Sequence, residues 1–416
     1  MAPATQEVVV LGANFAGLGL THILERRIFP VLKRLDSAVT FHVTVVTPNS
    51  HFFFKVAAPR AISKSGAIAD DSLFRPISEG LKQYGDSVSL IQGKAVKLTP
   101  ETRKVTVETN IGERQDVAYD YLFISTGTTS ASPLWTLHDN HEKTVKAIHE
   151  INDILPKIKS VLIAGAGPVG VETAGEIAHN YPEVKITIVS AGEVLNGLKP
   201  GTSTKAKQFL KGAKAEVLIN KRVKDHSTTN GSTKVELDDG SSRTVDLFID
   251  SRGASKINND FLPGSWLDAT GRVTTRDAYF RVKGDGQADV SGVYVVGDIV
   301  SGSTNTAIEL DAQVLCATSS FSVDVARKLG HDTSKSPGLL SYIPLIGSWF
   351  KSNVPRQAEF KPMKDTILVP FGPTGGVGQI FGWGAPSFMV KKAKAEKFLI
   401  ELVEPAITGN KYAKIT

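Results

Sequence analysis

The segment VVVLGANFAGLGL, Val8 to Leu20, gives the first indication of the fold of this chain. Four apolar residues lead directly into Gly12, and a helical pattern follows the glycine and continues to about Leu35. A strand, a glycine turn and a helix in this order are typical of a dinucleotide-binding unit, whose turn carries the fingerprint G-x-G-x-x-G. Here the fingerprint is broken, because it reads Gly12-Ala13-Asn14-Phe15-Ala16-Gly17.

Asn14 stands where the second glycine of the fingerprint normally lets the backbone approach a pyrophosphate. Asparagine is among the few non-glycine residues that readily adopt positive φ, so we expect Asn14 to keep the shape of the turn. Its side chain must then point away from the phosphates or bond to them. We predict a modified nucleotide loop whose binding residues are Gly12, Ala13, Asn14, Phe15, Ala16 and Gly17, with its affinity left open.

The same order of elements occurs twice in the chain. TFHVTVV, Thr40 to Val46, alternates as a strand does and completes the first βαβ unit. The second unit is SVLIAGAGPVGVETAGEIAHNYPEVKITIVS, Ser160 to Ser190. A hairpin and an apolar strand follow each unit, and these strands end at Thr126-Gly127 and at Arg252-Gly253. This pattern indicates an internal duplication of a nucleotide-binding module.

The second glycine loop is complete, since Gly165-Ala166-Gly167-Pro168-Val169-Gly170 carries all three glycines between a strand and a helix. It predicts a pyrophosphate site at a helix N-terminus. We assign to this site Gly165, Gly167, Val169, Gly170 and, at the end of the next strand, Ser190.

Two residues of the second unit leave alternatives open. Ser190 stands where an acidic residue would bind the ribose of NADH, and no arginine adjoins it to bind a 2′-phosphate, so the choice between NADH and NADPH stays open. Glu172, on the first turn of the helix, is our candidate catalytic residue, pointing along the dinucleotide toward the redox centre. Alternatively, it is a carboxylate that the helix dipole favours.

A third glycine element, SGVYVVGDIVSG, runs from Ser291 to Gly302. Asp298 follows its strand directly and precedes a helical pattern of apolar residues, so it is placed to bind a ribityl hydroxyl or to organise a flavin pyrophosphate. The predicted fold is α/β, with two Rossmann-like domains in tandem and a C-terminal α+β region. We place the discontinuous first domain at 1–130 and 283–335, the inserted second domain at 131–282, and the C-terminal region at 336–416.

Composition excludes several classes of function. The chain has 416 residues, 41% hydrophobic and 22% charged, which is typical of two or three globular domains. Cys316 is its only cysteine, so it has neither an internal disulfide nor a thiolate metal cluster, and we assign no metal site. The net charge of +6 on so long a chain is more typical of a solvated surface than of a nucleic-acid site.

The N-terminal sequence MAPATQEVVVL lacks the features of a secretory signal, and no apolar run reaches the length of a membrane span. We therefore expect a protein that is not secreted. A cytoplasmic location is our first expectation, with mitochondrial and membrane-peripheral locations as alternatives. We expect a monomer or a homodimer.

The motifs, taken in order, carry a resemblance to a known group. The series Gly12–Gly17, Thr126-Gly127, Gly165–Glu172 and Gly297-Asp298 resembles the two-dinucleotide-binding-domain flavoproteins. Within these, the chain is most similar to the apoptosis-inducing-factor-like oxidoreductases, which include ferroptosis suppressor protein and many fungal members; type II NADH dehydrogenases are close neighbours. GAGPVGVETAGEI and VYVVGDIV are the most specific segments, and FFKVAAPRA, Phe53 to Ala61, resembles a flavin-edge segment.

The resemblance implies FAD on the first module and Asp298, facing the nicotinamide of NADH or NADPH on the second. It places Lys55 and Arg60 near the flavin or its phosphates, where a cation would stabilise the reduced flavin; the alternative is a surface lysine and a loop arginine. It also implies that the backbone of Val96 contacts the adenine and that Thr126 and Gly127 bind the cofactor.

The chain departs from the group at two places. Phe53 and Phe54 stand where members often carry histidines, which leaves their proton relay in doubt. The helix after Asp298 keeps Ala312-Gln313 of a quinone-site pattern but lacks its later polar partner. The expectation of a quinone acceptor therefore rests on the resemblance.

We weigh three functions. The first is an FAD-dependent NAD(P)H oxidoreductase that passes electrons to a quinone-like or other small acceptor; without a cysteine pair, it is not a disulfide reductase. The second is an FAD-dependent tailoring oxidoreductase acting on a dedicated metabolite, with a pocket lined by the aromatic residues Trp349, Phe350, Phe381, Trp383 and Phe388.

The third is a redox-dependent protein that binds nucleic acid, which we consider the less favoured partner, or a membrane surface. Four lysines lie near apolar residues in the C-terminal segment, as in an interfacial helix. The residues are Lys391, Lys392, Lys394 and Lys397, with Phe388, Val390, Phe398 and Leu399. The alternative is an amphipathic helix packed on the body of the protein.

Overall fold

The two apolar runs of the first unit form neighbouring parallel strands. The computed structural model describes residues 5–333 and 354–413. In it, β1 (Thr5–Leu11) and β2 (Thr40–Thr47) pair from Thr5 opposite Thr40 to Leu11 opposite Val46. Val8 to Leu11 of β1 are all buried, which explains why they are apolar without alternation, and in the alternating strand β2 the polar Thr44 is buried as well. The connecting helix is α1 (Phe15–Ile23), followed by a π-helical stretch, Leu24–Ile28, and α2 (Phe29–Leu35).

The first sheet has seven strands, in the order β18-β8-β1-β2-β5-β6-β7. The remaining members are β5 (Val88–Thr99), β6 (Lys104–Thr109), β7 (Arg114–Ala118), β8 (Tyr121–Ile124) and β18 (Val293–Val295). β18 pairs in parallel with β8 although the whole second unit lies between them in sequence. The first sheet is therefore built from two separate parts of the chain.

The second sheet has four parallel strands, in the order β12-β11-β10-β16. They are β10 (Ser160–Ala164), β11 (Lys185–Ser190), β12 (Glu216–Ile219) and β16 (Leu247–Asp250). The helices of this unit are α7 (Pro168–Asn180) and α8 (Pro200–Gly212). A three-stranded antiparallel sheet accompanies it, made of β13 (Val223–Thr229), β14 (Ser232–Leu237) and β15 (Ser242–Val245).

Two short strands mark where the chain passes between the sheets. β9 (Thr128–Ser130) leaves the first sheet after β8 and pairs antiparallel with β17 (Ala254–Ile257), which leaves the second sheet after β16. The outward and return crossings thus lie side by side. This α/β fold, with two Rossmann-like sheets, is the predicted one, while the residue limits of the domains stay a proposal.

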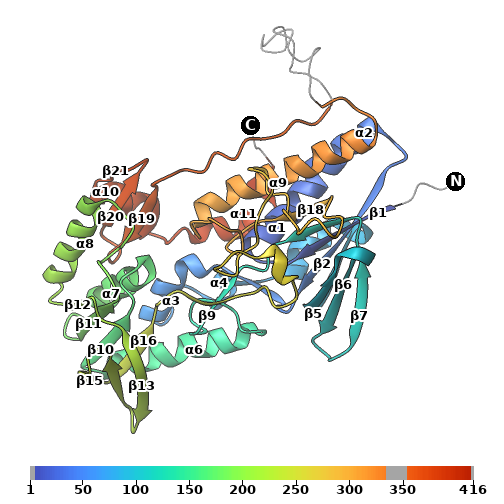
Figure 1. The fold of residues 1–416 in the computed structure, drawn as a ribbon. Helices are drawn as coiled ribbons and strands as arrows, with labels where there is room; N and C mark the ends of the chain where they lie inside the picture. Colours follow the sequence, from blue (N-terminus) through green and yellow to red (C-terminus); the bar gives the residue numbers. More distant parts are fainter. Residues whose placement is uncertain (1–4, 334–353, 414–416) are drawn as a thin grey trace.

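Smaller elements lie beside the two units. They are β3 (His51–Phe53), β4 (Phe74–Pro76), α3 (Ala58–Ser63), α4 (Asp70–Leu73), α5 (Ile77–Leu81) and α6 (His141–Ile154). Among them, α3 packs against α7 of the second unit. The long helix α9 (Ala307–Lys328) lies along α1, and both cover the first sheet (Figure 1). Phe321 of α9 is fully buried and packs against Phe41, Tyr121 and Phe123 of the strands.

The C-terminal region has a small sheet and helices of its own. It contains the antiparallel strands β19 (Ile367–Pro370), β20 (Gly376–Ile380) and β21 (Trp383–Gly384), then α10 (Ser387–Val390) and α11 (Val403–Thr408). β19 and β20 contact α7 and α8 of the second unit, whereas α11 contacts α1 and α5 of the first (Figure 1). The C-terminal region therefore packs against both nucleotide-binding units. Its predicted start, at 336, lies outside the described residues.

None of the helices in the described part of the chain has both the length and the apolar character that crossing a bilayer requires.

Candidate functional site

The turn and packing glycines of the two loops are constrained in the same way. Gly12 has φ +99°, and a Cβ there would lie 2.5 Å from the carbonyl oxygen of Ser125. Gly165 has φ +112°, and its Cβ would lie 2.6 Å from the oxygen of Ser251. Gly17 and Gly170 each close the turn, since a Cβ there would lie 1.7 and 1.9 Å, respectively, from the oxygen of the first glycine of the loop. Only glycine fits at these positions.

Asn14 does not adopt the positive φ that we expected, so that prediction is wrong. Its φ is −91°, and Gly167, at the equivalent place in the second loop, has φ −73°. Any residue adopts these values, so the position does not require glycine for its backbone. The side chain of Asn14 bonds the backbone of Phe53: Nδ2 donates to its oxygen at 3.4 Å, and Oδ1 accepts from its N–H at 3.4 Å.

Both loops leave backbone N–H groups available where a pyrophosphate is predicted to lie. A Cβ on Gly167 would meet no atom within 4 Å, so the face of the second loop is open. Neither α1 nor α7 has a side-chain cap among the described residues. The first N–H groups of both helices are thus free to bind phosphate oxygens. The first loop offers the same donors, with the Asn14 side chain turned to Phe53.

Asp298 lies against the first loop, together with two other predicted cofactor segments. A Cβ on Gly297 would lie 3.8 Å from that of Ala16, which places the glycine-aspartate turn beside α1. The Oδ2 atom of Asp298 lies 3.6 Å from Nζ of Lys55 and accepts a hydrogen bond from Thr128 at 3.5 Å. The fold therefore brings together residues that are far apart in sequence, as one flavin site requires.

Gln313 supports this turn from α9. Its Oε1 accepts a hydrogen bond from the Gly297 N–H at 2.6 Å, and its Nε2 donates to Glu309 at 2.9 Å. Glu309 also accepts from the N–H of Thr304 at 2.8 Å, and the Gln313 side chain is fully buried. The retained part of the quinone-site pattern thus holds the backbone beside Asp298. Sequence reasoning missed Glu309, although the spacing of Thr306 and Glu309 matches a capping box.

The turn at Thr126-Gly127 is clamped by a residue that sequence reasoning did not identify. The side-chain amide of Asn258 donates to the oxygen of Thr126 at 2.8 Å, and the Thr126 hydroxyl donates to the oxygen of Asn258 at 2.7 Å. Gly127 has φ +60° and open space around it. Asn258 follows β17 directly, so its role depends on the pairing of β17 with β9, for which the sequence carries no signal.

Val96 is the extra residue of a β-bulge between Ala95 and Lys97. A bulged residue stands outside the hydrogen-bond ladder, so its backbone groups are available to another partner. This geometry suits the predicted backbone contact with adenine, which stays a prediction.

The residues predicted to bind the second nucleotide lie at the carboxyl edge of the second sheet. Ser190 ends β11, is buried, and its oxygen accepts a hydrogen bond from the N–H of Lys221 at 3.0 Å. Val169 lies half-buried in the first turn of α7, between Gly167 and Gly170. The loop, the helix N-terminus and the end of β11 therefore share one edge, as a dinucleotide site requires.

Glu172, the candidate catalytic residue, is paired with Lys394 of the C-terminal region. The carboxylate is buried, and its Oε1 lies 2.5 Å from Nζ of Lys394, which also donates to the oxygen of Leu368 at 3.3 Å. Burial raises the pKa of Glu172, and the Lys394 ammonium opposes that shift. The charge of the carboxylate is thus balanced by a lysine of the segment for which the sequence left open an interfacial helix or a helix packed on the body.

Arg60 occupies a junction of three segments. Its Nε and Nη2 atoms donate to the buried Glu176 of α7 at 2.9 and 2.8 Å, and Nη1 donates to the oxygen of Glu396 at 2.8 Å. The guanidinium also lies 4.6 Å from the ring centre of Phe398. The structure thus links α3, α7 and the C-terminal region through Arg60, and its contact with flavin stays a prediction.

The C-terminal basic segment does not present the face expected of an interfacial helix. Val390 and Phe398 are fully buried, and Lys394 is held by Glu172. For these residues, the interpretation as a helix packed on the body is correct. Of the aromatic residues expected to line a pocket, Phe381, Trp383 and Phe388 are exposed on the surface, whereas Trp349 and Phe350 lie outside the described residues.

Two Rossmann-like sheets, each with a glycine loop, and an aspartate that returns to the first loop define a flavoprotein with two dinucleotide-binding domains. Comparison with known proteins supports this class of protein. The chain belongs to the pyridine nucleotide-disulphide oxidoreductase family, whose model matches residues 6–313. It is an FAD-dependent NAD(P)H oxidoreductase.

Relatives of known sequence cover nearly the whole chain. Oxidoreductase ptaL of Pestalotiopsis fici is 30% identical over 404 residues, which is 95% of this chain and 97% of the relative. Oxidoreductase phnG of Penicillium herquei is 30% identical over 441 residues, 99% of this chain and 98% of the relative. Ferroptosis suppressor protein 1 of Xenopus tropicalis is 24% identical over 410 residues, 94% of this chain and 93% of the relative.

Among solved structures, NDH2 of Plasmodium falciparum in complex with NADH has a TM-score of 0.62 at 15% identity, over 96% of this chain and 98% of that one. At this identity, the likeness shows the fold alone.

Proposed function

We propose that this chain passes electrons from NADH or NADPH through FAD directly to a small, quinone-like acceptor. The proposal rests on the burial and the raised pKa of the single cysteine, Cys316. Cys316 is buried in α9, with its Sγ 3.2 Å from the oxygen of Ala358, and burial raises its pKa to about 12. Such a thiol is unreactive, and the chain has no second cysteine to pair with it. Electrons therefore have no protein disulfide to pass through.

The residues present fit the two cofactors. FAD, when bound, takes up a hydride from the nicotinamide and releases two electrons to the acceptor. The first loop and the N-terminus of α1 would hold its pyrophosphate, with Asp298 at the ribityl chain and Lys55 as the nearby cation. The second loop and α7 would hold NAD(P)H, with Ser190 at the ribose. Val96, Thr126 and Gly127 complete the FAD site in this proposal.

Glu172 acts in this proposal together with Lys394. Glu172 lies on the helix that follows the second loop, and its ion pair with Lys394 keeps the carboxylate in one orientation. We assign it the role of positioning the nicotinamide against the flavin. Because the ammonium comes from the C-terminal region, docking of that region is part of assembling the site.

A quinone-like acceptor is supported by the resemblance to ferroptosis suppressor protein and to type II NADH dehydrogenases. The greater identity to the two fungal oxidoreductases, 30% against 24%, supports the second candidate, a tailoring oxidoreductase acting on a dedicated metabolite. The two candidates share the cofactors and the first half-reaction, and they differ only in the acceptor.

The test is anaerobic reduction of the purified protein by NADH and by NADPH, followed by reoxidation with a panel of quinones, ferricyanide and oxygen. Bleaching of the flavin absorbance on reduction and rapid recovery with quinones is the expected result. Reduced protein that ferricyanide reoxidises but no quinone does favours the tailoring enzyme. Colourless protein that cannot be reconstituted with FAD contradicts both candidates.

A further inference from the structure

A glutamine of the C-terminal region is buried against the start of α8. Gln379 lies on β20 and is only 1% exposed. Its Oε1 atom accepts two hydrogen bonds, one from the backbone N–H of Lys199 at 3.0 Å and one from the hydroxyl of Thr202 at 3.2 Å. Burying an amide costs free energy unless its polar atoms are paired, so these bonds are what makes Gln379 acceptable in the interior.

Both groups that bind Gln379 belong to the N-terminal end of α8. Lys199 is the N-cap residue of this helix, and Thr202 lies in its first turn. The N–H groups of Thr202 and Ser203 donate to the oxygen of Lys199 at 2.9 and 3.2 Å. Gln379 therefore holds the beginning of α8 from outside the helix.

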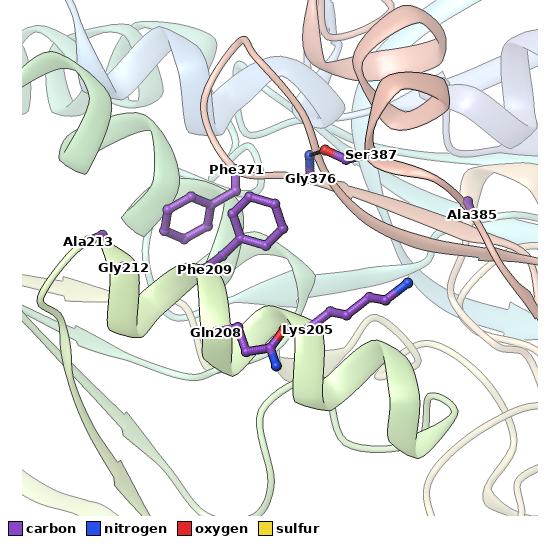
Figure 2. A pocket seen from close by; sticks show the side chains of 9 residues that line it. All are labelled: Lys205, Gln208, Phe209, Gly212, Ala213, Phe371, Gly376, Ala385 and Ser387. Atoms are coloured by element: carbon purple, nitrogen blue, oxygen red, sulfur yellow. Dashed lines mark hydrogen bonds between the residues drawn. The ribbon is translucent and has the colours of Figure 1, made fainter.

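Beyond its first turn, α8 borders a groove that separates it from the C-terminal strands. The groove measures about 570 Å³, and Figure 2 shows the rings of Phe209 and Phe371 next to one another on its wall. The centres of these two rings are 5.5 Å apart. Lys205 and Gln208 also line the groove from α8. The first turn of the helix does not border the groove, and there Gln379 makes a direct polar contact with it.

The segment between β11 and α8 connects this contact to the second glycine loop. It comprises residues 191–199, and the N–H of Leu195 donates to the oxygen of Ala166, inside the glycine loop, at 2.8 Å. The hydroxyl of Ser203, in the first turn of α8, donates to the oxygen of Val194 at 2.6 Å. The start of α8 thus holds the segment, and the segment contacts the glycine loop.

The backbone of this segment needs such support. Leu195 is buried and has φ +52°, which is unfavourable for a leucine. A residue in such a conformation keeps it only where the surrounding structure imposes it. If the start of α8 were released, we expect Leu195 to relax and its bond to Ala166 to weaken.

We propose that Gln379 is a positioning residue for the nicotinamide nucleotide, because it fixes the segment 191–199 against the second glycine loop. The inference rests on the proposed function, in which that loop and Ser190 bind NAD(P)H. In folds of this kind, the nucleotide lies beyond the carboxyl ends of the strands, where this segment begins. Gln379 acts at the adenosine end of the nucleotide, whereas Glu172 is assigned to the nicotinamide. Loss of Gln379 should therefore weaken binding without slowing hydride transfer.

Stopped-flow reduction of the full-length, FAD-loaded protein by NADH and by NADPH separates the two effects. It yields the Kd for the nucleotide and the limiting rate of flavin reduction. Gln379→Leu removes the acceptor and leaves the Thr202 hydroxyl buried and unpaired. It should raise the Kd by about fivefold or more and change the limiting rate by less than about twofold. Bound FAD should stay at the wild-type level.

Two further variants test the hydrogen bonds themselves. Gln379→Glu keeps an oxygen acceptor, and a negative charge is favourable at a helix N-terminus, so its Kd should lie within about twofold of the wild-type value. Thr202→Val removes one of the two donors and should raise the Kd by itself. Added to Gln379→Leu, it should change the Kd little further, because both substitutions break the same contact.

Gln208→Leu is the matched control, because it makes the same substitution at an exposed residue of α8 (Figure 2). Its Kd should equal that of the wild type. The proposal is overturned by a wild-type Kd in Gln379→Leu, by an equal rise in Gln208→Leu, or by a loss of FAD or of limiting rate as large as the rise in Kd. If Gln379→Leu does not fold, a wild-type Kd in Thr202→Val overturns it instead. Wild-type flavin that neither nucleotide reduces contradicts the proposed function, and the inference with it.

Discussion

Glu172 and Lys394 form a buried ion pair across 222 residues of sequence, with 2.5 Å between Oε1 and Nζ. The acid belongs to the helix that follows the second glycine loop, and the base belongs to the C-terminal region. Each charge is acceptable in the interior only because the other is there. The nucleotide-binding unit and the C-terminal region therefore depend on one another.

Lys394→Met should destabilise the protein by about 3–5 kcal/mol, because it leaves a buried carboxylate without its partner. Burial holds the pKa of Glu172 above its value in the unfolded chain, so the folded state binds the extra proton. The stability of the variant should therefore be highest at acid pH and fall as the pH rises through the raised pKa. Thermal unfolding across a pH series measures both effects.

The companion variants separate packing from function. Lys397→Met removes an exposed lysine of the same segment and should leave the melting temperature unchanged. Glu172→Gln/Lys394→Met removes both charges and should regain much of the lost stability. If this double variant also reduces its flavin at the wild-type rate, the pair has no role in positioning the nicotinamide.

Gly12→Ala should impair FAD binding far more than Asn14→Gly, although both variants change the first loop. Gly12 has φ +99° and no room for a Cβ, so alanine there should abolish FAD retention. Asn14 has an ordinary φ, and glycine removes only two long hydrogen bonds to Phe53. We expect the Kd for FAD to change by less than about tenfold in Asn14→Gly.

Fluorescence titration of the apoproteins with FAD measures these constants, and far-ultraviolet circular dichroism checks the fold. A large loss of affinity in Asn14→Gly would show that the amide contributes directly to the flavin site. A normal affinity in Gly12→Ala would contradict the geometry of the turn.

His22 should make the protein less stable in acid. It lies in α1, with Nδ1 2.7 Å from the hydroxyl of Tyr84 and with Gly409 packed on its ring. Burial, helped by the charge of Arg26, lowers its pKa from 6.5 to about 4. The unfolded chain thus binds more protons than the folded one between these values. Stability is full above about pH 6.5 and falls toward pH 4, by about 3 kcal/mol in total.

The ionisation of Glu25 changes the stability of the protein with pH in the opposite direction to that of His22. The two effects must therefore be measured separately. Burial raises the pKa of Glu25 from 4.5 to about 7, so its contribution to stability falls as the pH rises through that range. Melting temperatures of His22→Gln, measured in a Glu25→Gln background, should vary less between about pH 7 and pH 5 than those of Glu25→Gln alone. Parallel curves for the two proteins would exclude His22 as the cause.

Ser190→Asp should shift the choice of donor toward NADH. A carboxylate at the end of this strand can bond the ribose hydroxyls of NADH and repels the 2′-phosphate of NADPH. We expect the ratio of kcat/KM for NADH to that for NADPH to rise by about tenfold or more. Thr187→Asp, on the same strand but three residues earlier, is the control. An unchanged ratio in Ser190→Asp would place the ribose elsewhere.

Much of the scaffold of the site was predictable because its signals are local. Gly12 and Gly165 mark turns with positive φ, and the apolar strands around them mark buried parallel sheets; both depend on a few consecutive residues. The capping spacing of Thr306 and Glu309 was equally local, but it was overlooked. Asn14 shows the limit of this reasoning, since a residue's tolerance for a conformation does not reveal which conformation its position adopts.

Two nucleotide units, their order and the lack of a cysteine pair can all be read from the residues alone. The pairing of side chains cannot: Lys55 meets Asp298, Arg60 meets Glu176, and Lys394 meets Glu172 only in the folded chain. The same is true of the burial of Phe398 and the exposure of Trp383. Strands and turns follow from short-range backbone preferences, whereas ion pairs and burial depend on how distant segments pack.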